Sequence, residues 1–251
     1  MQSILSGDAI TNETLAAMSK YTGKETGQKE RAQHALDTMN EDKKYKALEF
    51  VNELKKEYGT GASTLCLFYN ATGDAINFIE KHDWYGHSYK YPYPPELGNG
   101  QWGAFLHVHQ GGSATGAIGA IVYRGKNCDG NDTDWMQAWY NPWAGTNRAY
   151  TEVHEAGYFT EGVWDGIYDK LSNTSANNDY QGNGGQSGVG IGNDTSPYFD
   201  GVMTLEGLFL PFLCSSNHLH NQKHKKKLHL QPSRSTKHYE TNTQNPFWRL
   251  H

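Results

Sequence analysis

Cysteine is scarce in this chain. Its three cysteines among 251 residues, Cys66, Cys128 and Cys214, match neither a disulfide framework nor a metal-binding spacing. Long apolar runs are also missing: the most apolar segment, 205–213, is far shorter than the roughly 20 residues of a membrane-spanning helix, so we expect no transmembrane segment. A positive net charge is absent too, since the chain carries −5, and specific nucleic-acid binding is therefore not expected.

The sequence signatures of common enzyme classes are absent as well. No GxSxG, HExxH, P-loop or Rossmann fingerprint occurs. Glu152, Glu155 and Glu161 near His154 superficially suggest acid–base chemistry, but carboxylates on solvent-facing strand and loop positions are an ordinary explanation. We therefore expect a protein that is not an enzyme and that holds no cofactor.

Two pairs of histidines are candidate metal ligands. His107 and His109 would share one face of a strand, and His82 and His87 form the other pair. The spacing supplies no third ligand, so we expect structural histidines and no metal site. A metal-dependent hydrolase that uses His107, His109 and His154 stays open as an alternative.

The first eight residues lack the basic and apolar regions of a secretory signal, which predicts cytoplasmic residence. The run of lysines and a histidine at 223–227 offers nuclear entry as an alternative. We interpret the Asn-x-Ser/Thr sequons as chance occurrences in a chain rich in these residues; they lie at Asn12, Asn70, Asn131, Asn173 and Asn193.

What the chain does contain is 36% hydrophobic and 13% aromatic residues, enough to bury a core. Charge divides it unevenly. Residues 212–251 hold seven Lys or Arg and one Asp or Glu, whereas residues 1–211 have a net charge of −11. We predict an N-terminal helical segment at 1–60, a β-sandwich domain at 61–211 and a disordered basic, His- and Lys-rich tail at 212–251.

Three helices are predicted in the N-terminal segment, over 11–20, 26–39 and 41–58. The last carries Tyr45, Leu48, Val51 and Leu54 on one stripe, with Gly59 as its stop. These charged helices should pack on the β-domain or on each other, while a detachable membrane-inserting element is the alternative.

Strands follow. The stretch 102–108 carries large apolar groups on both faces, which predicts a strand covered on both sides. We predict that it forms a hairpin with 117–123, and that 64–69, where Cys66 is a buried hydrophobe, forms another with 75–80.

Further strands are predicted at 134–139, 148–155, 163–169 and within 195–210. Trp135, Gln137 and Trp139 should share one face of the first of these. The segment 172–197 is rich in Gly, Asn and Ser, and we interpret it as a mobile loop.

Aromatic residues gather in two places, around 84–93 and around 139–143. Tryptophan and tyrosine combine an apolar surface with a polar group, which suits the recognition of a sugar or a lipid headgroup. The candidate ligand-binding residues are Trp84, Tyr85, Tyr89, Tyr93, Trp139, Tyr140 and Trp143.

Several of these stretches resemble a known family. The run 101–124, with Tyr69-Asn70-Ala71-Thr72-Gly73 and Tyr93-Pro94-Pro95, is similar to the 23 kDa jasmonate-induced proteins of plants, over roughly residues 10–200. More distantly, 114–119 followed by Val122-Tyr123 resembles the strand core of actinoporins and fungal fruit-body lectins, which are β-sandwiches, over about 62–170. In the actinoporin comparison, Pro142 and Trp143 fall on a Pro–aromatic pair beside a headgroup-binding pocket.

The fold expected from this resemblance and from the strand pattern is mainly β within the α+β class: an antiparallel, actinoporin- or lectin-like β-sandwich after a helical segment. The family resemblance implies a protein of the plant stress and defence response that answers to jasmonate. We expect it to recognise carbohydrate or a lipid headgroup through exposed aromatics. The alternatives are an actinoporin-like pore former, in which helix 41–58 inserts into the membrane, and a storage or interaction protein without a small-molecule site.

Overall fold

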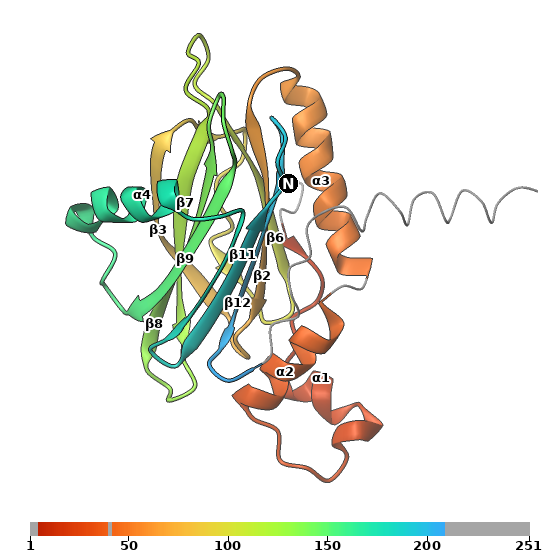
Figure 1. The fold of residues 1–251 in the computed structure, drawn as a ribbon. Coiled ribbons are helices and arrows are strands. Elements are labelled where there is room, and N and C mark those ends of the chain that lie inside the picture. The colour runs from red at the N-terminus through yellow and green to blue at the C-terminus, as the bar shows by residue number, and fades with distance from the viewer. Residues whose placement is uncertain (1–4, 40–41, 209–251) are drawn as a thin grey trace, which may run out of the picture. The chain divides into compact units, whose positions relative to one another are not determined.

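The structure is a computed structural model, and it describes residues 5–39 and 42–208. Two β-sheets lie face to face (Figure 1). Among the described residues, sheet A has seven strands in the order β1-β6-β2-β12-β11-β10 with β4 beside β6, and sheet B has five in the order β5-β3-β7-β8-β9. All strand pairs are antiparallel except β2 and β12, which run parallel. The predicted β-sandwich is confirmed, with this parallel pair as its one departure among the described strands.

The strands are β1 (Leu5–Ser6), β2 (Ser63–Ala71), β3 (Ile76–Tyr85), β4 (His87–Ser88), β5 (Glu96–Leu97), β6 (Trp102–Val108), β7 (Ala117–Lys126), β8 (Asp132–Asn141), β9 (Arg148–Glu155), β10 (Asn177–Gly182), β11 (Gly185–Ile191) and β12 (Tyr198–Leu205). The helices are α1 (Asn12–Ala16), α2 (Gln28–Thr38), α3 (Asp42–Tyr58) and α4 (Trp164–Asn173), with 3₁₀ turns η1 (Ser19–Tyr21) and η2 (Glu161–Val163). The three helices predicted before residue 60 are confirmed, and Gly59 follows α3 with a φ of +84°.

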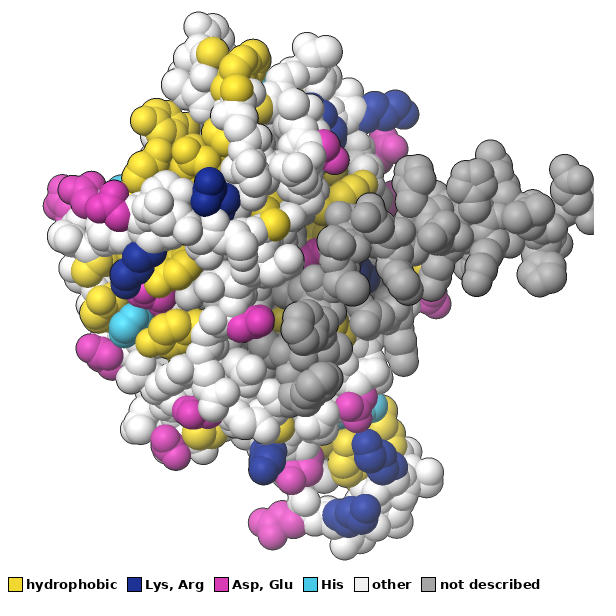
Figure 2. Space-filling model, viewed as in Figure 1, with side chains coloured by type: hydrophobic (Ala, Val, Ile, Leu, Met, Phe, Trp, Pro, Cys, Tyr) yellow, Lys and Arg dark blue, Asp and Glu magenta, His cyan; other side chains and the backbone are white. Residues whose placement is uncertain are grey.

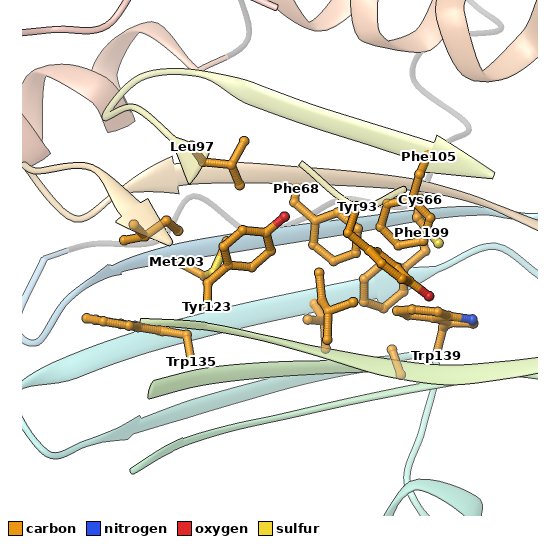
Figure 3. Packing of buried hydrophobic residues seen from close by; sticks show 14 of the residues in the cluster. Cys66, Phe68, Tyr93, Leu97, Phe105, Tyr123, Trp135, Trp139, Phe199 and Met203 are labelled. Atoms are coloured by element: carbon orange, nitrogen blue, oxygen red, sulfur yellow. The ribbon is translucent and has the colours of Figure 1, made fainter. Parts of the chain in front are cut away.

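The main core fills the space between the sheets. Figure 3 shows Phe68 and Phe105 on sheet A facing Trp135 and Trp139 on sheet B. Phe68 and Phe105 stack at 5.2 Å, and Trp139 meets both edge-on. Alternation along β8 is as predicted, because Trp135 and Trp139 point into this core while Met136 points outward.

The outer face of sheet A is covered by α2 and α3 (Figure 1). Two buried aromatic side chains of this face bond to the helical segment: the Tyr69 hydroxyl donates to the Ala35 carbonyl at 2.7 Å, and the Trp102 indole donates to the Met39 carbonyl at 3.1 Å. Burial of β6 on both faces follows from this arrangement and confirms the prediction for 102–108. Among the described helices, none has the length and apolar character required to cross a membrane.

The outer face of sheet B is covered by α4, which lies on the opposite side of the sandwich from α3 (Figure 1). Its buried residues Trp164, Ile167 and Leu171 recur at helical spacing and pack on small or apolar residues of β7 and β8. The prediction of a strand over 163–169 is therefore wrong. The stripe at i, i+3 and i+7 is the physical reason that this segment is a helix.

Both predicted hairpins are wrong. Strand β6 pairs with β1, β2 and β4 in sheet A, whereas β7 pairs with β3 and β8 in sheet B. In the same way, β2 belongs to sheet A and β3 to sheet B. Because each strand carries apolar groups that need cover, the chain crosses between the sheets at these turns instead of folding back within one sheet.

The loop predicted over 172–197 is mostly a hairpin of β10 and β11. Its turn is Asn183-Gly184, both with positive φ, which is the two-residue turn favoured between antiparallel strands. A last strand within 195–210 is confirmed as β12. The basic tail predicted from residue 212 lies outside the described residues.

Candidate functional site

One end of the sandwich gathers most of the long loops. Strands β2, β7, β9 and β12 begin there, and β3, β6, β8, β11 and α3 end there. This is the end at the top of Figure 1, away from α1 and α2. We call it the loop end, and it comprises residues 59–62, 86–92, 109–116, 142–147 and 192–197.

Exposed aromatic side chains mark this end. Among the described residues, four large hydrophobic side chains are exposed. Trp143, at 48%, belongs to the loop end, and Tyr85, at 43%, is the last residue of β3 and directly precedes the 86–92 segment. The other two, Tyr45 on α3 and Ile79 on β3, lie along the body of the protein. Figure 2 shows hydrophobic side chains exposed at the same upper end. An exposed tryptophan leaves a large apolar surface in water, and exposed apolar surfaces of this kind mark binding sites.

Trp143 rests on a row of rings. Its indole meets the His109 imidazole at 5.3 Å, His109 meets Tyr58 at 6.1 Å, and Tyr58 meets Tyr89 at 5.2 Å, all edge-on. We call these four residues the rim row. They come from the β8–β9 loop, the end of β6, the end of α3 and the segment after β4. Distant parts of the chain thus hold Trp143 in place.

Close backbone packing and side-chain hydrogen bonds hold the loops of the loop end against one another. Gly116 has a φ of +73°, and a side chain there would overlap the backbone of Asn141 and Pro142, so the 109–116 loop lies directly against the loop that carries Trp143. Glycine is required at such an approach. On the other side, the buried Asn147 amide donates to the carbonyls of Gly192 and Asp194 at 2.9 and 2.8 Å.

A second aromatic group lies at the same end on the outer face of sheet B. Tyr85, Ile118 and Tyr140 are register partners across β3, β7 and β8. The α4 residue Tyr168 lies 5.5 Å from Trp84 and 6.1 Å from Tyr140, measured between ring centroids. Burial and the neighbouring Tyr140 raise the pKa of Tyr168 to about 12, so its hydroxyl stays protonated at neutral pH.

Little net charge is present at the loop end. The segments 59–62, 109–116, 142–147 and 192–197 contain no Lys or Arg and a single acidic residue, Asp194. In 86–92 the one such cation, Lys90, pairs with Glu57 at 2.7 Å. Lys55, on α3, donates to the Gly61 carbonyl at 3.0 Å, and its ammonium lies 5.4 Å from the centroid of the Tyr58 ring. Burial lowers the pKa of Lys55, and the nearby Asp194 partly offsets this effect.

The seven aromatics predicted from the sequence fall into three places. Trp143 and Tyr89 belong to the rim row, and Trp84, Tyr85 and Tyr140 to the group on sheet B. Trp139 and Tyr93 are core residues, with 0% and 7% of their surface exposed. The expectation that these two are exposed is wrong, because Trp139 points between the sheets and Tyr93 stacks on Phe78 at 5.3 Å.

The three histidines of the hydrolase alternative are not brought together. His107 is buried between the sheets, His109 lies in the rim row, and His154 packs on the outer face of sheet B against Tyr158. Over residues 5–39 and 42–208, no group of three His, Cys, Asp or Glu side chains is placed to hold a metal ion.

Glu152 is not the solvent-facing carboxylate expected from the sequence. Its side chain is 2% exposed and accepts hydrogen bonds from the Tyr150 hydroxyl and from Lys170 at 2.5 Å, while His154 Nε2 lies 3.0 Å away. Burial opposes its ionisation, but these partners outweigh burial and lower the pKa of Glu152. The carboxylate is therefore ionised and satisfied within the protein.

Sequence reasoning misses three residues of the two aromatic groups: Tyr58, His109 as a ring support, and Tyr168. The sequence predicts Tyr58 on a helix, and its position as the last residue of α3 brings it to the rim row. The strand predicted over 163–169 does not bring Tyr168 beside Trp84, whereas helix α4 does. The spacing of Trp164, Ile167 and Leu171 was the signal that could have found it.

Comparison with known proteins adds relatives to this geometry. A family model described as Nakanori-like protein matches residues 6–206. A 23 kDa jasmonate-induced protein of Hordeum vulgare is 42% identical over 206 residues, which is 80% of this chain and 98% of the relative. A jasmonate-induced protein homolog of Atriplex canescens is 34% identical over 106 residues, 41% of this chain and 56% of the relative.

Among solved structures, the chain is similar to the lipid binding protein Nakanori. The two share 31% identity with a TM-score of 0.73, and the match covers 79% of this chain and 98% of the other. Residues 6–206, which the family model matches, contain strands β2 to β12 and helices α1 to α4.

Proposed function

Because this chain belongs to the Nakanori-like protein family, we propose that it is a non-enzymatic protein that binds lipid headgroups at a membrane surface through its loop end. The observation that carries the proposal is Trp143, 48% exposed on the rim row. Tryptophan favours the interface between water and the acyl region, where its ring is apolar and its N–H stays hydrated. Nakanori, whose solved structure is similar to that of this chain, is a lipid binding protein.

The resemblance to the jasmonate-induced proteins is confirmed by the Hordeum vulgare relative. We propose on that basis that the protein serves in a stress response that answers to jasmonate. Measurement of the transcript and protein after jasmonate treatment tests this part separately, and an unchanged level would contradict it.

The lipid proposal is tested by co-sedimentation of the purified chain with vesicles of phosphatidylcholine, with and without phosphatidylserine. We expect binding by the wild type and a loss of about tenfold, near 1.4 kcal/mol, in Trp143→Ala. Tyr45→Ala is the matched control, because Tyr45 is 44% exposed but lies on α3 away from the loop end. Binding that survives Trp143→Ala, or falls equally in Tyr45→Ala, would contradict the proposal.

Release of a trapped dye from the same vesicles separates docking from pore formation. Our proposal predicts binding without release, since α3 is bound to sheet A through buried residues and through the Lys44–Asp200 ion pair at 3.0 Å. Dye release would favour the pore-forming alternative. If the protein neither binds the vesicles nor releases the dye, a storage or interaction protein is favoured.

We further propose that the protein acts in the cytoplasm and docks on the cytoplasmic leaflet. One observation supports reading the sequons as chance: Asn70 is fully buried, and its amide donates to the carbonyls of Asp74 and Leu97, so a glycan on this nitrogen is incompatible with the fold. Imaging of a fluorescent fusion tests the location, and a purely secreted fusion would contradict it.

A further inference from the structure

A second cluster of polar and aromatic side chains lies away from the loop end, on the outer face of sheet B beside α4. Strand β10 lies against β9 here, since the Asn178 side chain accepts from the Thr151 N–H at 3.0 Å. In Figure 2, cationic, acidic, histidine and hydrophobic side chains lie together at the left of the molecule, beside the position of α4 in Figure 1. We call this cluster the side patch, and it consists of Tyr150, Glu152, His154, Tyr158, Lys170 and Tyr180.

Its aromatic part is a stack of flat rings. His154 and Tyr158 lie nearly parallel, with 3.7 Å between ring centroids and 11° between planes. Phe159 supports both rings edge-on, at 5.5 Å from His154 and 5.2 Å from Tyr158, and Tyr180 lies 5.9 Å from His154. Phe159 is buried while the other three are half-buried, so the stack has an anchored base and a surface open to solvent.

Glu152 positions the polar side chains of the side patch through hydrogen bonds. The Tyr150 hydroxyl and the Lys170 ammonium both donate to Oε1 of this buried carboxylate. Burial, this hydrogen bond and the nearby Tyr180 and Tyr158 hydroxyls raise the pKa of Tyr150, so it remains a neutral donor. Within residues 5–39 and 42–208, the Tyr158 and Tyr180 hydroxyls have no hydrogen-bond partner, and both residues are half-buried.

The charges of the patch cancel. Glu152 is ionised, Lys170 is protonated, and the two are paired at 2.5 Å. Nothing in the patch therefore selects a charged ligand. Flat ring surfaces with hydroxyl and ammonium donors around them suit a molecule that has both a C–H face and several hydroxyl groups.

We propose that the side patch is a binding site for a neutral pyranose sugar, distinct from the loop end. The sugar's C–H face lies on the exposed part of the Tyr158 and Tyr180 rings, and its hydroxyls bond to the tyrosine hydroxyls and to the remaining N–H donors of Lys170. Strands β9 and β10 and helix α4 hold these groups before the ligand arrives, which lowers the entropic cost of binding. The site could take a free glycan or the sugar of a glycolipid, which share this chemistry.

The test is binding of the full chain to an array of neutral glycans, followed by calorimetry with the best soluble glycan and sedimentation with vesicles that carry the same sugar on a lipid. We expect at least a tenfold loss of glycan affinity in Tyr158→Ala and in Tyr180→Ala. Trp143→Ala is the comparison, since it removes the proposed membrane contact and should leave soluble glycan binding unchanged.

Thermal unfolding of each variant establishes that it is folded, and Tyr158→Leu keeps apolar packing if Tyr158→Ala is unstable. A wild-type protein that binds no neutral glycan overturns the proposal, as does binding that survives both tyrosine substitutions. Loss in Trp143→Ala alone overturns it too and moves the sugar to the loop end. Stronger binding to the glycolipid vesicles than to the free glycan would identify the lipid-linked source.

Discussion

Trp139 donates its indole N–H to Nδ1 of His107 at 3.1 Å, and this bond joins sheet B to sheet A inside the core. Because an indole nitrogen only donates, Nδ1 must accept, and the proton of the neutral imidazole is on Nε2. Nε2 then donates to Asp83 at 3.2 Å. The imidazole therefore connects strands β8, β6 and β3 through one defined tautomer.

Removing this indole N–H should weaken the protein without touching its ligand site. Trp139→Phe keeps an aromatic ring but leaves a buried imidazole nitrogen without its donor and creates a small cavity. We expect a loss of about 2–4 kcal/mol in the free energy of unfolding, measured by urea titration.

Vesicle binding by folded Trp139→Phe should equal that of the wild type. A variant of unchanged stability that binds lipid poorly would show that Trp139 contacts the ligand, as the sequence suggested, and would contradict its place in the core.

Acid should destabilise the protein through the same group. Burial lowers the pKa of His107, although Asp83 opposes this, while His87 and Lys81 add to the lowering. The unfolded chain then binds a proton near pH 6.5 that the folded chain does not, so the free energy of unfolding falls as the pH drops below about 6.5. The slope from one such group is at most about 1.4 kcal/mol per pH unit.

His107→Gln isolates this contribution, since a glutamine can accept from Trp139 and donate to Asp83 but has no proton to gain. Between pH 7 and 5 its stability should fall less steeply than that of the wild type. At lower pH, Asp83 contributes to the pH dependence of both proteins. Burial raises the pKa of Asp83, but the hydrogen bonds from His107 and Lys81 outweigh burial and bring this pKa to about 2. The stability that the ionised Asp83 contributes is therefore lost as the pH falls below about 4. Parallel pH profiles above pH 5 would contradict the role of His107.

Local patterns in this sequence predict elements well and pairings poorly. The stripe of α3 and the two-faced apolar pattern of β6 depend on residues close in sequence. The structure confirms the pattern of β6 and buries Leu48, Val51 and Leu54, but Tyr45, predicted on the same stripe, is 44% exposed. Whether β6 and β7 share a sheet depends on contacts of each strand with distant partners, which no turn sequence between them specifies. The β10–β11 hairpin could have been predicted, since Asn183-Gly184 is a strong turn signal that composition alone obscured.

The candidate site shows the same division. Aromatic residues near a Pro–Trp pair were found as a class, and Trp143 is exposed. The sequence does not predict which individual rings are exposed. Trp139 and Tyr140 are adjacent in sequence, yet Trp139 lies in the core and Tyr140 on the outer face of sheet B. The support of Trp143 by His109 and Tyr58 joins positions far apart in the chain, so only the fold reveals it.

Loss of Lys170 should destabilise the packing of α4. In Lys170→Met the buried Glu152 keeps Tyr150 and His154 but loses its cation. Because the lysine side chain is half exposed, we expect only about 1–2 kcal/mol by urea titration. Lys90→Met, which breaks the exposed pair with Glu57, is the control and should change little. Equal effects would mean that burial of Glu152 does not matter.

Truncation after Leu210 should leave the fold intact. The buried hydrophobic residues of the described chain end at Leu208, and β12 is the last strand of the part that the structure describes. We expect a cooperative thermal transition within a few degrees of that of the full chain, measured by circular dichroism. Loss of the cooperative transition would show that residues 211–251 belong to the folding unit.

The support of Trp143 can be tested without changing any aromatic residue. Gly61 has a φ of +115°, and a Cβ there would overlap the His109 imidazole, so Gly61→Ala should push His109 out of the rim row and release Trp143. Vesicle affinity should fall severalfold, approaching that of Trp143→Ala. Gly59→Ala is the matched control: its φ is +84°, but open space surrounds the new methyl group, so it carries only the backbone strain of about 1 kcal/mol. If the two variants bind lipid equally well while both remain folded, then Trp143 acts without the help of His109, and the loop end is a single anchor instead of a preorganised surface.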